Sequence, residues 1–194
     1  MISLHLFRVE SISPLLMHNP ASMGGVPAAG ADAKVRKIPS PQEEAERGAY
    51  RGADGVLYSP GIAWKSSLLS GCVGKRIGKR AASVFVQAGV FEAEERFPLY
   101  NPQTGEQIRE YGILTVRAVV QKNGIPRSRP IIPVWAVDVI FEIDDDFIVP
   151  SQVLSLMNDA GRIAGVGDWR PAKKGRYGRY KVIETKPAEI RLAA

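Results

Sequence analysis

Residues 164–182, AGVGDWRPAKKGRYGRYKV, decide how the rest of the sequence is interpreted. The stretch holds four glycines and six Lys or Arg residues, and Asp168 is its only acid. Glycine reaches backbone angles that are closed to other residues and lets a ligand approach the main chain. Amide groups and cations there could bind phosphates, while Trp169 and Tyr177 could stack on bases. The composition favours a nucleic-acid-binding loop, with an ordinary solvated face as the alternative.

Apolar residues at helical spacing precede this loop, and a short alternating segment follows it. The helix is expected to begin at Pro150 and Ser151, with Ser151 as its N-cap. The loop therefore leaves the C-terminus of a helix, where the dipole does not favour an anion, and enters a last strand, RYKVIE. Walker loops and dinucleotide fingerprints both open a helix, so neither motif fits here. The apolar stripe predicted to face the core is Val153, Leu156, Met157, Ala160 and Ile163.

The rest of the chain supplies the other elements of a small α+β domain. Alternating patterns predict strands at residues 2–12, 112–121 and 133–143, and helical segments are expected from Ile62 and around residues 79–91. Residues 99–108, LYNPQTGEQI, are typical of a turn. The order predicts a ferredoxin-like or RRM-like βαββαβ sandwich, with both helices on one sheet face and the other face open. RNA-recognition domains use such an open face for bases, although many ferredoxin-like proteins bind no nucleic acid.

Residues 13–54 follow the first strand and are rich in Ala, Gly and Pro. This composition cannot bury much apolar surface, so we expect a flexible insertion or lobe within a single domain of residues 1–194. With 45% apolar residues, the chain as a whole can still form a core.

The positive charge is segregated along the chain, whose net charge is +6. Residues 55–91 and 169–183 contain no acid, whereas acids gather at residues 43–46, 92–95 and 144–146. Segregation of this kind predicts a surface that faces a polyanion. A basic scaffold that meets an acidic protein partner is a further alternative.

Several classes of protein are not indicated by the sequence. Cys72 is the only cysteine, so an internal disulfide and a cysteine-based zinc site are excluded. No paired carboxylates, Ser-His-Asp pattern or metal-ligand cluster is visible, and we expect no cofactor and no metal. No signal peptide and no apolar run of ~18–20 residues is found, which predicts a cytoplasmic protein without a membrane partner.

The loop resembles the glycine-rich loop of the RAMP superfamily of CRISPR-associated proteins, which lies between the last helix and last strand of a ferredoxin-like domain. Residues 57–71, LYSPGIAWKSSLLSG, are similar to the stretch pyIPGSSLKGALR of the members that form the guide-RNA backbone of effector complexes. Residues 7–19, FRVESISPLLMHN, are similar to the first strand and turn of those subunits. The three stretches follow the order of the family. A phage or mobile-element relative outside a CRISPR complex is the alternative.

The resemblance implies a sequence-independent subunit for single-stranded guide RNA in an antiviral ribonucleoprotein. Such a subunit packs side by side along the strand, as a homo-oligomer or with other subunits. Residues 121–131 occupy the slot of the family's thumb hairpin. The expected nucleic-acid contacts are Ser59, Lys65, Ser66, Ser67, Arg76, Lys79, Arg80, Lys122, Arg127, Arg129, Gly165, Gly167, Trp169, Arg170, Lys173, Lys174, Arg176, Tyr177 and Arg179.

Catalysis is not favoured, and no catalytic residue is assigned. Some family members cleave target RNA with an aspartate after the first strand, where Asp32 is the candidate. Others process guides with a histidine, and His18 is better placed for acid–base chemistry than His5, which lies within the strand. A metal-independent endoribonuclease is therefore one alternative function. A phage-type protein that binds or anneals single-stranded DNA is another.

Overall fold

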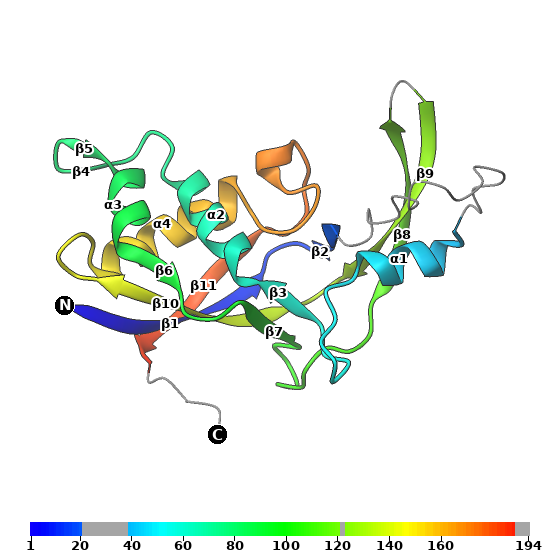
Figure 1. Ribbon diagram of the computed structural model, residues 1–194, viewed down its shortest axis with the longest axis horizontal. Coiled ribbons are helices and arrows are strands. Elements are labelled where there is room, and N and C mark those ends of the chain that lie inside the picture. The colour runs from blue at the N-terminus through cyan, green and yellow to red at the C-terminus, as the bar shows by residue number, and fades with distance from the viewer. Residues whose placement is uncertain (21–38, 121–122, 189–194) are drawn as a thin grey trace, which may run out of the picture.

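The computed structural model describes residues 1–20, 39–120 and 123–188, and its main body is an antiparallel sheet covered by helices (Figure 1). Helices α2 (Gly61–Gly71), α3 (Ala82–Gly89) and α4 (Pro150–Ile163) pack on the main sheet. The strand order is β11 (Tyr180–Pro187), β1 (Ile2–Ser11), β10 (Ala136–Asp144), β7 (Arg96–Tyr100) and β3 (Tyr58–Pro60), and β6 (Val90–Glu92) also pairs with β10.

The two faces of the sheet follow from the alternation of the central strands. Phe7 pairs with Val139 in the register of β1 and β10, and both side chains are fully buried under the helices. The next pair along the strands, Arg8 and Asp138, lies on the opposite face. Since one face is apolar and the other is charged, the helices can cover only the first.

Helix α4 confirms most of the predicted stripe and corrects its ends. Val153, Leu156, Met157 and Ala160 are buried in the core, whereas Ile163 is 52% exposed at the last turn. The helix begins at Pro150, as predicted, but its N-cap is Val149, two positions before the predicted cap Ser151. Proline is favoured at the first helical position, which Pro150 occupies.

The mixed α+β architecture with a mostly antiparallel sheet confirms the predicted fold class, but one predicted strand lies in a different sheet from the one expected. The sequence predicts the second strand of the sheet at residues 112–121, yet β6 and β7 take the place beside β10. In β7, Phe97 and Leu99 are buried while Arg96 and Pro98 are exposed. The alternation is short and contains Pro98, and part of it lies in the predicted turn, so the strand is easily missed in the sequence.

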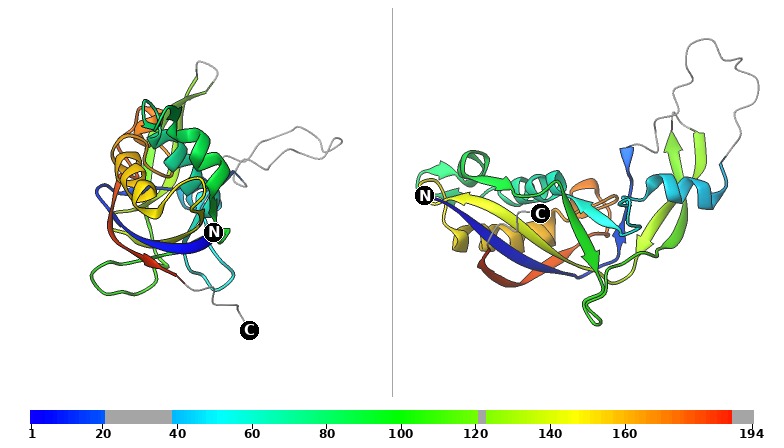
Figure 2. Two further views of the ribbon diagram at one scale, coloured as in Figure 1. Left: turned by 90° about the vertical axis from the view of Figure 1, so that its left-hand side faces the viewer. Right: turned by 60° about the horizontal axis from the view of Figure 1, so that its bottom comes forward.

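Residues 112–121 instead begin a long hairpin. Strand β8 (Gly112–Val120) pairs with β9 (Asn123–Ile132), and the short β2 (Leu15–Leu16) pairs with the other edge of β9. The two views in Figure 2 and that of Figure 1 show this hairpin projecting from the main body. It is longer than the thumb predicted at residues 121–131.

Helix α1 (Pro41–Gly48) packs against β9 and lies in the stretch that the sequence predicts as an insertion. Its start is a capping box, in which Ser40 Oγ accepts from the Glu43 amide and the Glu43 carboxylate accepts from the Ser40 amide. Ala45 and Gly48 are buried. The sequence SPQE carries this signal, so the helix could have been predicted. Residues 21–38 lie outside the described residues, as do the candidates Asp32 and Lys122.

A small hairpin, β4 (Arg76–Ile77) with β5 (Arg80–Ala81), follows the C-terminal end of α2. Among the helices of the described ranges, none has the length and apolar character that crossing a bilayer requires.

Candidate nucleic-acid interface

The glycine-rich loop, residues 164–179, folds back onto the segment that follows β1. The amide of Asp168 donates to the carbonyl of Leu16 at 2.8 Å, and the amide of Gly178 donates to the carbonyl of Pro14 at 2.8 Å. Gly167 has a φ of +76°, and an added Cβ there would lie 2.6 Å from the carbonyl oxygen of Leu16. Glycine is therefore needed both for the backbone angle and for this close approach.

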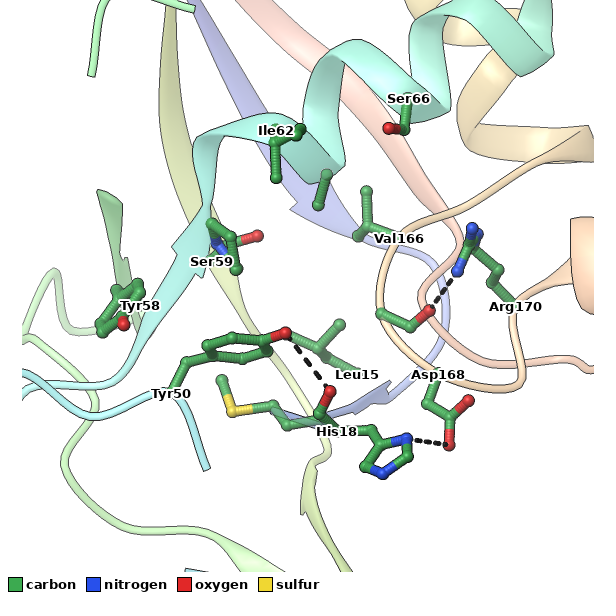
Figure 3. A pocket seen from close by; sticks show the side chains of 14 residues that line it. Leu15, His18, Tyr50, Tyr58, Ser59, Ile62, Ser66, Val166, Asp168 and Arg170 are labelled. Atoms are coloured by element: carbon green, nitrogen blue, oxygen red, sulfur yellow. Dashed lines mark hydrogen bonds and ion pairs between the residues drawn. The ribbon is translucent and has the colours of Figure 1, made fainter. Parts of the chain in front are cut away.

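A cavity of about 370 Å³ lies between this loop and the start of α2 (Figure 3). We call it the α2–loop cavity. It joins the three sequence stretches that resemble the RAMP superfamily, although they lie far apart along the chain. The lining residues come from the segment after β1 (Leu15, Met17, His18), from β3 and α2 (Tyr58, Ser59, Pro60, Ile62, Ala63, Ser66), from the loop (Val166, Gly167, Asp168, Arg170) and from Tyr50.

The N-terminal end of α2 forms one wall of the cavity. Its N-cap is Pro60, and no side chain caps the helix. The first amide groups of a helix have no partner within the helix, and they carry the positive end of its dipole. Since Ile62 and Ala63 line the cavity, this helix end can attract an anion at the cavity wall.

Asp168 is the charged centre of the opposite wall. Its Oδ2 lies 2.5 Å from Nε of Arg129 on β9 and 3.9 Å from Nδ1 of His18. Burial lowers the pKa of His18 below its ordinary value of 6.5, and Arg129 lowers it further, while Asp168 opposes both. The imidazole is therefore neutral at pH 7. Asp168 thus connects the projecting hairpin, the loop and the segment after β1.

Several predicted contacts do converge at the α2–loop cavity. Ser59, Ser66, Gly167 and Arg170 line it, and Gly165 is buried in the same loop. Arg170 is positioned by a hydrogen bond from its Nη1 to the carbonyl of Gly167 at 2.8 Å.

The outer part of the loop presents further predicted contacts. The side chains of Lys173, Lys174 and Arg176 are exposed. Trp169 and Tyr177 are half-buried, and the Arg176 guanidinium lies 5.7 Å from the centroid of the Tyr177 ring. The backbone of the half-buried Arg179 is bonded to residues 12 and 13. We call Lys173, Lys174 and Arg176 the loop cations.

Two contacts predicted on α2 lie elsewhere. Ser67 is buried, and its hydroxyl shares a hydrogen bond of 3.1 Å with the hydroxyl of Tyr180 in the core. The Nζ of Lys65 lies 3.9 Å from the ring centroid of Phe91 on β6, and Lys65 does not line the cavity. Ser67 is therefore a packing residue, and Lys65 faces an aromatic neighbour.

The predicted single groove, in which Lys65, Arg76, Lys79 and Arg80 lie beside the loop, is wrong. Arg76, Lys79 and Arg80 are exposed, but they belong to the β4–β5 hairpin (Figure 1). That hairpin follows the C-terminal end of α2, whereas the cavity is at the N-terminal end. A helix of 11 residues separates the two sites by roughly 16 Å.

Two of the contacts predicted on the projecting hairpin, Arg127 and Arg129, are engaged within the protein. Arg127 Nη1 lies 2.9 Å from a carboxylate oxygen of Glu44, and Arg129 is paired with Asp168. They organise the cavity and the α1 contact, and their charge is largely neutralised.

The open sheet face is built from paired charges. Arg8 donates two hydrogen bonds to Asp138, at 2.8 and 2.7 Å, and the hydroxyl of Tyr100 donates to the same carboxylate at 2.5 Å. Burial acts to raise the pKa of Asp138, but these hydrogen bonds hold it below its ordinary value. Glu184 also lies 3.7 Å from Arg8. The charges of this face are paired with one another, in contrast to the exposed loop cations beside the cavity.

The sequence analysis missed the aromatic lining of the cavity. Tyr50 and Tyr58 flank a turn at Asp54 and Gly55, and their ring centroids lie 5.7 Å apart. Two tyrosines on either side of the turn sequence GADG are a local signal that could have paired them. Tyr50 was overlooked because it falls within the predicted insertion.

No protein-family model matches this sequence, and the search of curated proteins gives no match. Among solved structures, the chain is similar to one in the cryo-EM structure of the type III-B Cmr-beta bound to cognate target RNA. That similarity has a TM-score of 0.56 and 11% identity, and it covers 96% of this chain and 60% of that chain. Cmr6 from Pyrococcus furiosus is also similar, with a TM-score of 0.41, 14% identity, and coverage of 94% of this chain and 99% of that one. The similarity to the Cmr-beta chain shows that this chain has a RAMP-like fold, in agreement with the three sequence stretches.

Proposed function

We propose that this chain is an RNA-binding subunit of a CRISPR-type ribonucleoprotein, in which single-stranded RNA passes over the α2–loop cavity. One observation carries the proposal. The start of α2 and the glycine-rich loop, which resemble RNA-contacting segments of RAMP proteins, line the same cavity. The RAMP-like fold supports the same conclusion.

The chemistry of the surface fits a phosphate backbone. The amide groups at the start of α2 supply partial positive charge, and the exposed Ser66 supplies a hydroxyl donor. The loop cations supply full charges beside the cavity. Such contacts do not read base edges, so binding would be largely independent of sequence and sensitive to salt.

The projecting hairpin of β8 and β9 fits the place of a thumb that crosses the bound strand. It is joined to the loop through Arg129 and Asp168, so its base lies beside the cavity. In this proposal the RNA is a guide strand, and subunits pack side by side along it, either as copies of this chain or with other subunits.

Fluorescence anisotropy with labelled RNA and DNA strands of about 12 nucleotides tests the proposal, since strand-binding sites commonly span ~4–16 nucleotides. Lys174→Glu with Arg176→Glu should weaken RNA binding at least tenfold. The matched control, Lys79→Glu with Arg80→Glu, makes the same charge change at the other end of α2 and should have a smaller effect. Raising the salt to about 0.5 M should also weaken binding steeply.

Absence of RNA binding at low salt would refute the proposed function. Equal losses in the two double variants would place the strand elsewhere on the surface. Tighter binding of the matched DNA would favour the alternative of a single-stranded DNA binding or annealing protein, because only RNA offers a 2′-hydroxyl.

A metal-independent endoribonuclease is the second candidate function. The observation that favours it is the position of His18 at the cavity, with Nδ1 3.9 Å from the Asp168 carboxylate. A neutral imidazole oriented by a carboxylate can act as a general base. Cleavage of labelled RNA in the presence of a chelator, lost in His18→Ala, would establish this activity. Intact RNA after prolonged incubation would exclude it.

A further inference from the structure

The α2–loop cavity has an apolar and aromatic half. Leu15, Met17, Ile62 and Val166 line it together with Tyr50, whose ring lies across the cavity from the start of α2 in Figure 3. Its volume of about 370 Å³ is within the range of small-ligand sites. The cavity is therefore large enough and apolar enough for a flat ring.

Tyr50 is a fixed platform within this half. Its hydroxyl donates to the backbone carbonyl of His18 at 3.3 Å, which holds the ring in place. Burial raises the pKa of this hydroxyl, so it stays protonated as a donor. The neighbouring Tyr58 is engaged by Arg96, whose guanidinium lies 5.1 Å from the Tyr58 ring centroid. Tyr50 is accordingly the ring that we expect to stack on a ligand.

The other half of the cavity is polar. It contains the Asp168 carboxylate, the neutral imidazole of His18 and the hydroxyl of Ser59. Asp168 is held in place by Arg129, and Arg170 is held by Gly167. These groups offer both donors and acceptors, which suit the polar edge of a heterocycle.

The distribution of charge sets the direction in which a nucleotide would enter. Inside the cavity the Asp168 carboxylate is paired with Arg129 and half of the lining is apolar, whereas the loop cations outside it are exposed and attract a phosphate. The phosphates would therefore stay at the surface while the base turns inward.

We propose that the α2–loop cavity binds a single nucleobase that is unstacked from the bound RNA strand, with Tyr50 as the stacking platform. This inference rests on the proposed function and adds a base-binding subsite to it. Tyr50 was not among the residues that the sequence indicated, and the geometry of the cavity identifies it.

The experiment compares two strands of about 12 nucleotides, oligouridine RNA and a matched abasic strand that keeps the sugars and phosphates. Their affinities are measured for the wild-type chain, for Tyr50→Leu and for Tyr50→Phe. Tyr50→Leu should weaken binding of oligouridine about tenfold, which corresponds to ~1.4 kcal/mol. Binding of the abasic strand should not change, and this unchanged affinity also shows that the variant is folded. Tyr50→Phe keeps the ring and should retain most of the affinity for oligouridine.

An equal effect of Tyr50→Leu on both strands, or no effect on either, would overturn the base subsite while RNA binding itself stands. If Tyr50→Leu fails to fold, photocrosslinking of 5-iodouridine RNA to the wild-type chain decides the question. A crosslink to Tyr50 supports the proposal, and crosslinks to Trp169 or Tyr177 without Tyr50 overturn it. A wild-type chain that binds neither strand refutes the proposed function instead.

Discussion

Arg129 on β9 and Asp168 in the glycine-rich loop form an ion pair, with 2.5 Å between Nε and Oδ2. The side chains are only 13% and 21% exposed, so solvent screens the pair less than a surface pair. The pair joins the projecting hairpin to the loop at the edge of the α2–loop cavity, and it makes the geometry of the cavity depend on the hairpin.

Breaking this pair from one side should destabilise the protein. Arg129→Met leaves the Asp168 carboxylate partly buried without its main cation, and we expect a loss of about 1–3 kcal/mol in the free energy of unfolding. The double variant Arg129→Met, Asp168→Asn should recover part of the lost free energy of unfolding, because no partly buried carboxylate is then left without its cation. Urea unfolding measures both. As a control, Lys181→Met removes the exposed partner of Glu10 and should cost less than ~1 kcal/mol. Identical losses in Arg129→Met and Lys181→Met would contradict the role of the pair.

The pH dependence of stability should carry a contribution from His18. Its pKa is lowered in the folded protein, first by burial and then by Arg129, whereas in the unfolded chain it titrates near 6.5. As the pH falls below about 6.5, the unfolded state therefore binds a proton that the folded state does not, and stability is lost until the lower pKa is reached. Urea unfolding at several pH values between about 5 and 7.5 should show a shallower loss in His18→Gln than in the wild-type chain. A parallel pH dependence of the two proteins would show that His18 titrates normally.

Core and surface substitutions should separate stability from binding. Leu156 is 6% exposed within the core, and Leu156→Ala should cost about 2–5 kcal/mol through the cavity that it leaves. Arg176 is exposed, and Arg176→Glu should change stability by no more than ~0.5 kcal/mol while it weakens RNA binding. Thermal unfolding and anisotropy measure the two effects. If Arg176→Glu lowered the melting temperature as much as Leu156→Ala, the loop would be part of the core.

The open face of the sheet offers a test of where the strand binds. Tyr100→Phe removes the hydroxyl that donates to Asp138 and leaves the ring in place. Because this face lies away from the α2–loop cavity, the affinity for RNA should stay within about twofold of the wild-type value, a change of ~0.4 kcal/mol. A tenfold loss would indicate that the strand lies on the open sheet, as in RNA-recognition domains.

The elements that could be predicted from the sequence are those with local signals. The alternation of β1 and the apolar stripe of α4 each arise within one element, and the glycine-rich loop is marked by its composition. The strand pairing could not be predicted in the same way. The pattern of β8 is equally suited to the main sheet and to a hairpin with β9, and the choice depends on contacts with distant residues.

The functional site could be predicted only in part, because its contacts also join residues that are distant in the sequence. Helical spacing shows that Lys65 is off the core-facing line of α2, but it does not show that Phe91 lies beneath its ammonium group. Spacing likewise cannot show that Arg129 is neutralised by Asp168, which is 39 positions later in the numbering. Tyr50 belongs to the stretch whose composition predicts a flexible insertion, so only the folded structure shows that this residue lines the cavity.

Gly61 stands at the start of α2, where an added Cβ would collide with the backbone carbonyl oxygen of Glu94. The position of the helix start, whose Ile62 and Ala63 line the cavity, is therefore fixed by contact between two stretches of main chain, and no side chain can be trimmed to relieve it. In a saturation mutagenesis screen selected for RNA binding, this position should tolerate almost no replacement although it need not touch the ligand. A loss of RNA binding on substitution of Gly61 would then reflect a displaced cavity wall and not the loss of a direct contact with RNA.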